Sequence, residues 1–244
     1  MENEFTPLTL DTPFRFACHH KVACFNECCR DLNQFLTPYD ILQLKNGLAL
    51  TSSAFLEQYT TLHTGPESGL PIVALKADTA SEMACPFVKP SGCSVYEHRP
   101  ASCRIYPVAR AITRSRETGL IEEHYALLKE SHCLGHAQDT RQTVREWVAS
   151  QELAAYNEFN DMLMEIIALK NQQGPEPLDM KSRLAFHMAL YDLDRFRVQV
   201  FEKGLLDDED PEGLGLDPDM LDQAQKDDEA LLRIGHAWVK RLFR

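Results

Sequence analysis

The sequence predicts an α+β fold, mostly α, in which an irregular cysteine-rich module with short strands packs on a helical C-terminal half. All eight cysteines lie at or before residue 133. From residue 139 onward, apolar residues recur at three- and four-residue steps, as is typical of amphipathic helices. We therefore expect a module at 1–138 and an acidic helical region at 139–244, packed against each other as one unit. With 44% hydrophobic residues, the 244-residue chain can bury a full core.

The first predicted helix has clear signals at both ends. Thr37 can act as its N-cap, Pro38 suits the first helical position, and Asp40 stands three residues after the cap. Gly47 is expected to end the helix. The preceding residues, 13–36, are predicted to be an irregular loop with helical fragments.

The rest of the cysteine-rich module should contain short elements. Ser52 or Ser53 can cap a second helix that runs to Tyr59. Residues 71–76 are rich in β-branched and apolar side chains and predict a short strand. Residues 108–114 and 120–127 could pair as a hairpin, since a Glu-Thr-Gly turn separates them.

The C-terminal region is predicted to be a series of helices separated by breaks. Apolar residues at 144–148 and 156–167 follow helical spacing, and the Gly-Pro-Glu-Pro segment at 174–177 interrupts the pattern. A further helix is expected around 193–201. Asp217 and Pro218 then predict the start of one final helix, whose apolar stripe reaches Leu242.

Charge limits the classes of partner. The formal net charge is −12, and no basic stripe is visible, which argues against binding to nucleic acid. The charge is uneven, because residues 1–138 carry −3 and residues 139–244 carry −9. The acidic helical region could therefore serve as a surface for a protein partner.

The sequence also predicts a cytoplasmic location. The first residues are acidic and are not followed by an apolar core, so they do not resemble a signal peptide. No run of about 18 apolar residues occurs, so no membrane span and no membrane partner are expected. In the cytosol, cysteines stay reduced.

Reduced cysteines in this number favour metal ligation over a framework of disulfides. Adjacent Cys28 and Cys29 support this interpretation, because neighbouring thiols cannot easily enter separate disulfides without strain. A third interpretation is a redox role in which some cysteines cycle as disulfides. All eight are candidate metal ligands: Cys18, Cys24, Cys28, Cys29, Cys85, Cys93, Cys103 and Cys133.

The spacing of the cysteines decides neither the identity of the metal nor the grouping of the cysteines into sites. Both zinc and iron-sulfur clusters take cysteine thiolates, and eight sulfurs fit two four-cysteine sites or one cluster and a smaller site. The spacings do not contain the C-x2-C pairs of zinc ribbons. Since adjacent Cys28 and Cys29 point in different directions, the sites should lie close together, and sequence neighbours need not share a site.

Other side chains near the cysteines are weaker candidates. With eight thiols available, histidines are expected outside the ligand set, although His19 and His132 are the ones of most interest. Tyr96 and Tyr106 are expected to pack in the core or to hydrogen-bond a sulfur. The nearby histidines are His19, His20, His98, His132 and His136. Arginines that could offset thiolate charge, or lie on the surface, are Arg15, Arg30, Arg99, Arg104 and Arg110.

One long cysteine motif is similar to that of a known protein family. It comprises Cys28-Cys29, then Cys85-Pro-Phe, then Cys93-Ser-Val-Tyr-Glu-His-Arg-Pro-Ala-Ser-Cys103-Arg-Ile-Tyr-Pro, and finally Cys133-Leu-Gly. The chain thereby resembles the YkgJ-like cysteine-cluster family, CxxCxxCC, described as zinc- or iron-chelating, over roughly residues 14–136. The gaps between Cys18, Cys24 and Cys28 are wider than the hallmark. The resemblance implies that the eight cysteines are ligands for zinc or an iron-sulfur cluster.

An enzymatic alternative follows from one branch of similar proteins. Flagellin lysine N-methylase resembles this cluster and implies an iron-sulfur-dependent protein-modifying activity. The chain has no Gly-rich methyl-donor loop, however, and residue 31 is Asp31, so a radical S-adenosylmethionine motif is absent. Whether the chain is an enzyme is left open by the sequence.

Overall fold

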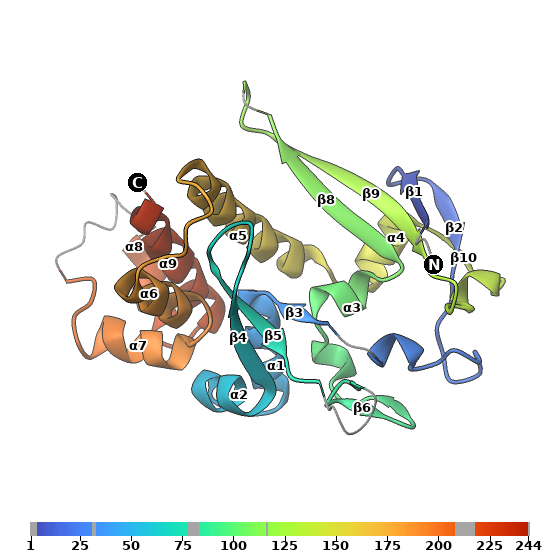
Figure 1. Ribbon diagram of the computed structural model, residues 1–244, viewed down its shortest axis with the longest axis horizontal. Helices are drawn as coiled ribbons and strands as arrows, with labels where there is room; N and C mark the ends of the chain where they lie inside the picture. Colours follow the sequence, from blue (N-terminus) through green and yellow to red (C-terminus); the bar gives the residue numbers. More distant parts are fainter. Residues whose placement is uncertain (1–3, 31–32, 78–82, 116, 208–217, 244) are drawn as a thin grey trace. The chain divides into compact units, whose positions relative to one another are not determined.

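The computed structural model describes residues 4–30, 33–77, 83–115, 117–207 and 218–243 (Figure 1). They belong to two compact units. The first is drawn from Met1–Leu32 and Ala77–Glu158, and the second from Asn33–Lys76 and Phe159–Arg244. The boundary expected after residue 138 therefore falls inside the first unit. Helices and small sheets occur together, which confirms the predicted α+β class with mostly α structure.

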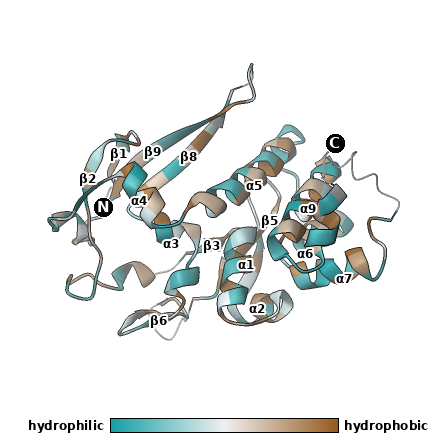
Figure 2. Cartoon of the chain, turned by 180° about the vertical axis from the view of Figure 1, so that it is seen from behind, coloured by the Kyte–Doolittle hydropathy of each residue, from teal (hydrophilic) through white to brown (hydrophobic). Residues whose placement is uncertain are grey.

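A three-stranded antiparallel sheet is the largest regular element of the first unit. Its order is β1 (Glu4–Leu8), β9 (Ile121–Lys129) and β8 (Val108–Arg114). The predicted hairpin is confirmed, with Val108 opposite Leu127 and Arg114 opposite Ile121. Toward its turn the hairpin is exposed and largely hydrophilic, whereas Tyr125 and Leu127 are buried (Figure 2).

A second, two-stranded sheet joins distant parts of the first unit. Its strands are β2 (Pro13–Arg15) and β10 (Arg141–Thr143), with Phe14 opposite Gln142. Neither strand was predicted, because three residues are too few to show an alternating pattern. The unit also contains these short elements: η1 (Glu27–Cys29), β6 (Val88–Lys89), β7 (Gly92–Cys93), η3 (Tyr96–His98), α3 (Ala101–Ile105), η4 (Gly135–Ala137) and α4 (Val144–Ser150).

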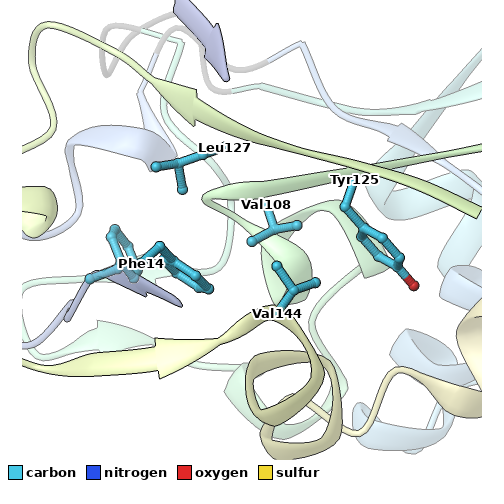
Figure 3. Close-up of a cluster of buried hydrophobic side chains, with 6 residues drawn as sticks. Phe14, Val108, Tyr125, Leu127 and Val144 are labelled. Atoms are coloured by element: carbon cyan, nitrogen blue, oxygen red, sulfur yellow. The ribbon is translucent and has the colours of Figure 1, made fainter. Parts of the chain in front are cut away.

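The hydrophobic core of the first unit lies between these sheets and α4 (Figure 3). Burying these apolar side chains stabilises the pairing of β2 with β10 and of β8 with β9. Trp147 of α4 packs against the cluster, and its indole N–H donates to the carbonyl of Ile105 at 2.8 Å. The cluster consists of Phe14, Phe16, Val108, Tyr125, Leu127 and Val144.

The predicted start of the first helix is confirmed in the second unit. Helix α1 (Pro38–Gly47) begins with a capping box, in which the Thr37 hydroxyl accepts from the Asp40 N–H and the Asp40 carboxylate accepts from the Thr37 N–H. Helix α2 (Ser52–Tyr59) is also present.

The predicted cap of α2 is wrong, however. Thr51 caps this helix by accepting from the Ala54 N–H. Ser52 and Ser53 are unavailable as caps because both hydroxyls donate to the carboxylate of Asp192, at 2.7 and 2.8 Å.

A small antiparallel sheet accompanies α1 and α2. Its order is β3 (Phe35–Leu36), β5 (Pro71–Leu75) and β4 (Thr60–Thr64). The strand predicted at 71–76 is therefore confirmed. Strand β4 was not predicted, since four of its five residues are exposed and its sequence has no apolar alternation.

The remaining helices of the second unit form most of its buried surface. They are the main part of α5 (Ala154–Gln172), α6 (Met180–Leu190), α7 (Leu193–Phe201), α8 (Pro218–Ala224), α9 (Asp228–Lys240) and the short η5 (Arg241–Phe243). Hydrophobic and hydrophilic residues alternate along α6, α7 and α9 (Figure 2). Phe159, Phe186, Phe196 and Leu231 are fully buried.

The prediction of one final helix is wrong. Two helices, α8 and α9, occupy this region, because Asp227 has an extended backbone and caps α9 by accepting from the Glu229 N–H. The proposed cap at Asp217 lies outside the described residues. Among the residues that the structure describes, no helix combines the length and hydrophobicity needed to cross a membrane.

Candidate metal centre

The pairing of β2 with β10 brings the first and last cysteines together. Beyond this pairing, the Phe16 N–H donates to the carbonyl of Thr140 at 3.1 Å, and the Ala17 N–H donates to that of Gly135 at 3.2 Å. The chain entering the first cysteine loop therefore runs beside the chain that follows Cys133. A Cβ at Gly135 would lie 2.5 Å from the Phe16 ring, so only glycine fits this close approach.

The first cysteine loop consists of consecutive tight turns. The Val22, Phe25 and Cys29 N–H groups each donate to a carbonyl three residues earlier, at 2.9–3.0 Å. Val22 is buried and anchors the loop, and Asn26 adopts the left-handed conformation (φ 72°) just before η1. This confirms the predicted irregular segment with helical fragments.

Four thiols line one small cavity. Cys18, Cys24 and Cys28 come from the first loop, and Cys133 comes from the segment after β9. The cavity measures about 30 Å³, which is room for very few water-sized spheres. The rest of its lining consists of Phe16, Tyr106, His132 and Gly135.

Polar contacts inside this group favour thiolate chemistry. The Leu134 N–H donates to the sulfur of Cys24 at 3.1 Å, a contact that stabilises a thiolate. Burial, and then the neighbouring thiols of Cys28, Cys24 and Cys133, raise the pKa of Cys18 to about 11. Since like charges at the other cysteines disfavour its thiolate, a cation among them would lower this pKa.

Cys28 and Cys29 differ in protonation although they are adjacent. The Cys29 thiol donates a hydrogen bond to the Cys28 sulfur, which lowers the pKa of Cys28 to about 7 although burial opposes it. The same hydrogen bond, together with burial, raises the pKa of Cys29. In this pair the hydrogen bond therefore favours ionisation of Cys28 before that of Cys29.

The other four cysteines gather around η1 and the β6–β7 hairpin. The Cys85 N–H donates to the carbonyl of Cys29 at 2.8 Å. In the hairpin, Val88 pairs with Cys93, which places Cys93 beside the segment that starts at Cys85. The Cys29 thiol interacts electrostatically with those of Cys85 and Cys103.

Backbone groups also surround these sulfurs. Burial raises the pKa of Cys85, whereas the N–H groups of Phe87 and Val88, which donate to its sulfur, lower it. Burial likewise raises the pKa of Cys93, opposed by an N–H···S bond from Val95 and by the positive charge of Arg99. Such N–H···S contacts are typical of second-shell support for metal-bound sulfur.

The structure therefore groups the cysteines differently from their order in the sequence. Cys133 joins the first loop, and Cys29 faces the later cysteines. The two groups adjoin, since Cys28 also acts electrostatically on Cys85 and Cys93. The sequence indicated that Cys28 and Cys29 point apart, but it contained no signal for the place of Cys133, because short β pairs set that place.

Comparison with known families finds a match for the cysteine-rich segment. Residues 17–134 match the family "CxxCxxCC: Putative zinc- or iron-chelating domain". Residues 17–134 therefore resemble this domain, and we call this segment the CxxCxxCC domain. This match confirms the resemblance drawn from the cysteine motif, and its zinc or iron chemistry agrees with the predicted choice of cofactor. Searches of curated proteins and of solved structures find no significant match.

Two arginines of the CxxCxxCC domain are structural and not on the surface. Arg104 is buried and donates to the carbonyls of Glu97, of Arg99 (3.2 Å) and of Gln151 (2.9 Å). Arg99 is also buried, stacks 3.8 Å from the Tyr96 ring centroid and donates to the Gln151 side chain at 2.5 Å. These contacts hold the backbone on either side of α3, which carries Cys103.

The other predicted arginines have acidic partners on or near the surface of the domain. Arg15 lies 3.9 Å from Asp139. Arg110 lies 2.7 Å from Glu123. Arg30 lies 3.4 Å from Glu27.

One histidine and one tyrosine of the CxxCxxCC domain lie at the first thiol group. His132 lines the cavity, with its Nε2 3.7 Å from Glu130. Tyr106 lines it as well, and burial together with Cys133 and Glu130 raises the pKa of its hydroxyl. His19 does not line this cavity, and its Nδ1 accepts from the Lys21 N–H at 3.3 Å.

The donor set of the CxxCxxCC domain fits zinc or iron, because both metals accept four thiolates. The side chains are not yet arranged as a closed site. In the described part of the chain, no three Cys, His, Asp or Glu side chains are placed to hold a metal ion.

Proposed function

We propose that the CxxCxxCC domain holds a metal ion, zinc or iron, through the thiolates of Cys18, Cys24, Cys28 and Cys133. The observation that supports this proposal is the single cavity that these four thiols line. They come from segments at opposite ends of the domain sequence, so their convergence depends on the fold. Two of them, Cys18 and Cys28, are exposed, which gives a metal donor access to the cavity.

The size of the cavity favours one ion. A volume of about 30 Å³ suits a single cation surrounded by sulfur better than a cluster of several irons and sulfides. We therefore place a mononuclear site ahead of a cluster, and metal analysis distinguishes them.

The test is metal analysis of protein purified without oxygen, combined with its absorption spectrum. Cys133→Ser should reduce the bound metal, whereas His20→Ala should retain it, because His20 is an exposed residue of the same loop that does not line the cavity. Zinc or iron without sulfide would support the mononuclear site. Iron and sulfide in equal amounts, with a brown colour, would establish the cluster instead. An unchanged metal content in Cys133→Ser would contradict the proposed ligand set.

A further inference from the structure

We propose that strand β4 (Thr60–Thr64) binds a second copy of this chain, with the two β4 strands pairing antiparallel about Leu62. This interaction does not depend on metal binding and goes beyond the proposed function. In the second unit, β4 forms one edge of the small sheet with the order β3-β5-β4 (Figure 1). Four of its five residues are exposed, so another strand can reach this edge.

The hydrogen bonds at the two ends of the β4–β5 pairing show which backbone groups face the open edge. The Lys76 N–H donates to the carbonyl of Tyr59 at 2.8 Å, and the Gly65 N–H donates to that of Leu70 at 2.9 Å. Both bonds use an odd-numbered residue on the β4 side. Because hydrogen-bonded and non-hydrogen-bonded pairs alternate along antiparallel strands, the odd-numbered residues of β4 face β5. Its even-numbered residues therefore face the open edge.

The even-numbered residues of β4 are Thr60, Leu62 and Thr64. The Thr60 N–H donates to the Leu56 carbonyl at the end of α2, but its own carbonyl points outward. Within the described part of the chain, the N–H and C=O groups of Leu62 and Thr64 have no backbone partner. A row of such unpaired groups is a template for pairing with another strand.

The side chain of Leu62 extends the buried face of the sheet to this edge. Leu62 is the neighbour of Val73 across β4 and β5, and Val73 is the neighbour of Leu36 across β5 and β3. All three side chains therefore lie on one face. Val73 and Leu36 are buried, whereas Leu62 is 44% exposed. A leucine of a second copy, placed opposite Leu62, would remove this apolar surface from water.

The other long edge strands have features that oppose pairing, whereas β4 does not. Strand β1 contains Glu4 and Pro7, and strand β8 contains Arg110 and Arg114. Charges and proline are typical of edges that avoid association with other strands. Among the described strands of five residues or more, β4 is the edge strand that contains no Asp, Glu, Lys, Arg or Pro.

A second copy fits this edge because β4 is complementary to itself. Antiparallel pairing about Leu62 places Thr60 opposite Thr64, Thr61 opposite His63, and Leu62 opposite its own copy. Each Leu62 N–H can then donate to the other Leu62 carbonyl, and each Thr64 N–H can donate to the Thr60 carbonyl of the other copy. No like charges face each other within the paired strands. The contact is a two-fold one, which closes after two copies.

The experiment measures the mass of the full chain by sedimentation equilibrium at increasing protein concentration. A reducing agent is present throughout, so that the free cysteines do not link chains covalently. The wild-type chain should form a reversible dimer. A mass of one chain at every concentration up to about 1 mM would overturn the proposal.

Two leucine-to-lysine variants locate the contact. Leu62→Lys places two positive charges opposite each other at the two-fold axis, so it should weaken dimerisation by at least about tenfold. Leu120→Lys is the matched control, because Leu120 is a 69% exposed leucine of the β8–β9 hairpin, and it should dimerise as the wild type does. Unchanged dimerisation in Leu62→Lys would overturn the proposal. Loss of dimers in Leu120→Lys would also overturn it, since the hairpin would then carry the contact.

A mixing experiment tests the register of the two strands. Leu62→Glu alone should be monomeric, because two carboxylates would face each other. An equimolar mixture of the Leu62→Lys and Leu62→Glu chains should form dimers again, since opposite charges then lie at the two-fold axis. A mixture that stays monomeric would overturn the pairing about Leu62.

Hydrogen exchange of the wild-type chain, followed by NMR, gives a test without variants. The amides of Leu62 and Thr64 should exchange more slowly as the protein concentration rises. The amides of Thr61 and His63 face β5 and should exchange at rates that do not depend on concentration. Concentration-independent exchange at Leu62 and Thr64, in protein that sediments as a dimer, would overturn the assignment of the contact to β4.

Discussion

The two units of this chain are stabilised in different ways. The second unit has long amphipathic helices, and large side chains such as Phe186, Phe196 and Leu231 are fully buried. The first unit has one hydrophobic cluster of six buried residues beneath its sheets. Its cysteines lie on turns and on elements of two to five residues, and among them Cys133 packs against that cluster.

This difference indicates which of the two units a bound metal would stabilise. A helix with a buried apolar face is stabilised by burial alone. The segments at Cys24, Cys29 and Cys93 are held by a small number of backbone hydrogen bonds, each of which contributes about 1 kcal/mol. We therefore expect metal binding to stabilise the first unit and to leave the second unchanged.

Metal removal should produce the largest effect and tests the comparison directly. Structural zinc contributes on the order of 10 kcal/mol in small zinc domains, so treatment with a chelator should open the cysteine segments. Hydrogen exchange followed by mass spectrometry should then show faster exchange at residues 18–30 and 85–103. Helices α6 and α9 should exchange at unchanged rates. An equal increase of the exchange rates in both units would contradict the expectation that metal stabilises the first unit alone.

Truncation of a buried side chain should affect the second unit selectively. Leu190→Ala in α6 removes a fully buried side chain and should lower the free energy of unfolding by about 2–5 kcal/mol. Leu184→Ala, in the same helix, is the matched control, because Leu184 is 60% exposed and should change stability by about 0.5 kcal/mol or less. Denaturant titration measures both. A changed metal content in Leu190→Ala would contradict the independence of the two units.

A pH dependence should also belong to the second unit. Burial lowers the pKa of His236 to about 4, with Lys240 and Arg233 adding to this and the Leu232 carbonyl and Glu165 opposing it. Because the unfolded chain binds the proton near pH 6.5, stability is complete above that pH and is lost as the pH falls from about 6.5 to about 4. The loss should be about 1.4 kcal/mol per pH unit, or roughly 3 kcal/mol in all.

The fluorescence of Trp238 in a Trp147→Phe background reports on the second unit alone, since the chain has two tryptophans. His236→Asn is the control, because its side-chain amide nitrogen takes the place of the histidine Nδ1 that contacts the Leu232 carbonyl, but it does not titrate. Its unfolding free energy should vary less with pH than that of the parent. An identical slope in both proteins would rule out His236 as the cause.

Much of the fold could be predicted because it depends on local signals. The capping box at Thr37, the hairpin at 108–129 and the helical stripes from Val144 onward are properties of neighbouring residues. Asp227, in contrast, splits the last helical stripe, because its side chain is used as a cap, and periodicity alone does not reveal this.

The candidate site could be predicted only in part, because its membership depends on contacts between distant segments. The cysteine motif predicted the resemblance that the family match confirms. It could not place Cys133 beside Cys18, since this neighbourhood depends on the three-residue pairing of β2 with β10. Nor could it show that Arg99 and Arg104 are buried and bind carbonyls, because their sequence context is that of ordinary surface arginines.

The smallest expected effect concerns the backbone of the first unit. Gly92→Ala places a side chain at a φ of +119° and a Cβ 3.1 Å from the Phe25 ring, so it should cost about 1–3 kcal/mol at the β6–β7 hairpin. Gly119→Ala has a smaller backbone penalty, because its φ of +70° lies near the left-handed region, and its Cβ meets no atom of the described residues within 4 Å. Hydrogen exchange at residues 85–98 should therefore be faster in Gly92→Ala and nearly unchanged in Gly119→Ala. Equal exchange in both variants would mean that the backbone conformation of Gly92 does not stabilise the hairpin, and the comparison would then rest on buried apolar side chains in both units.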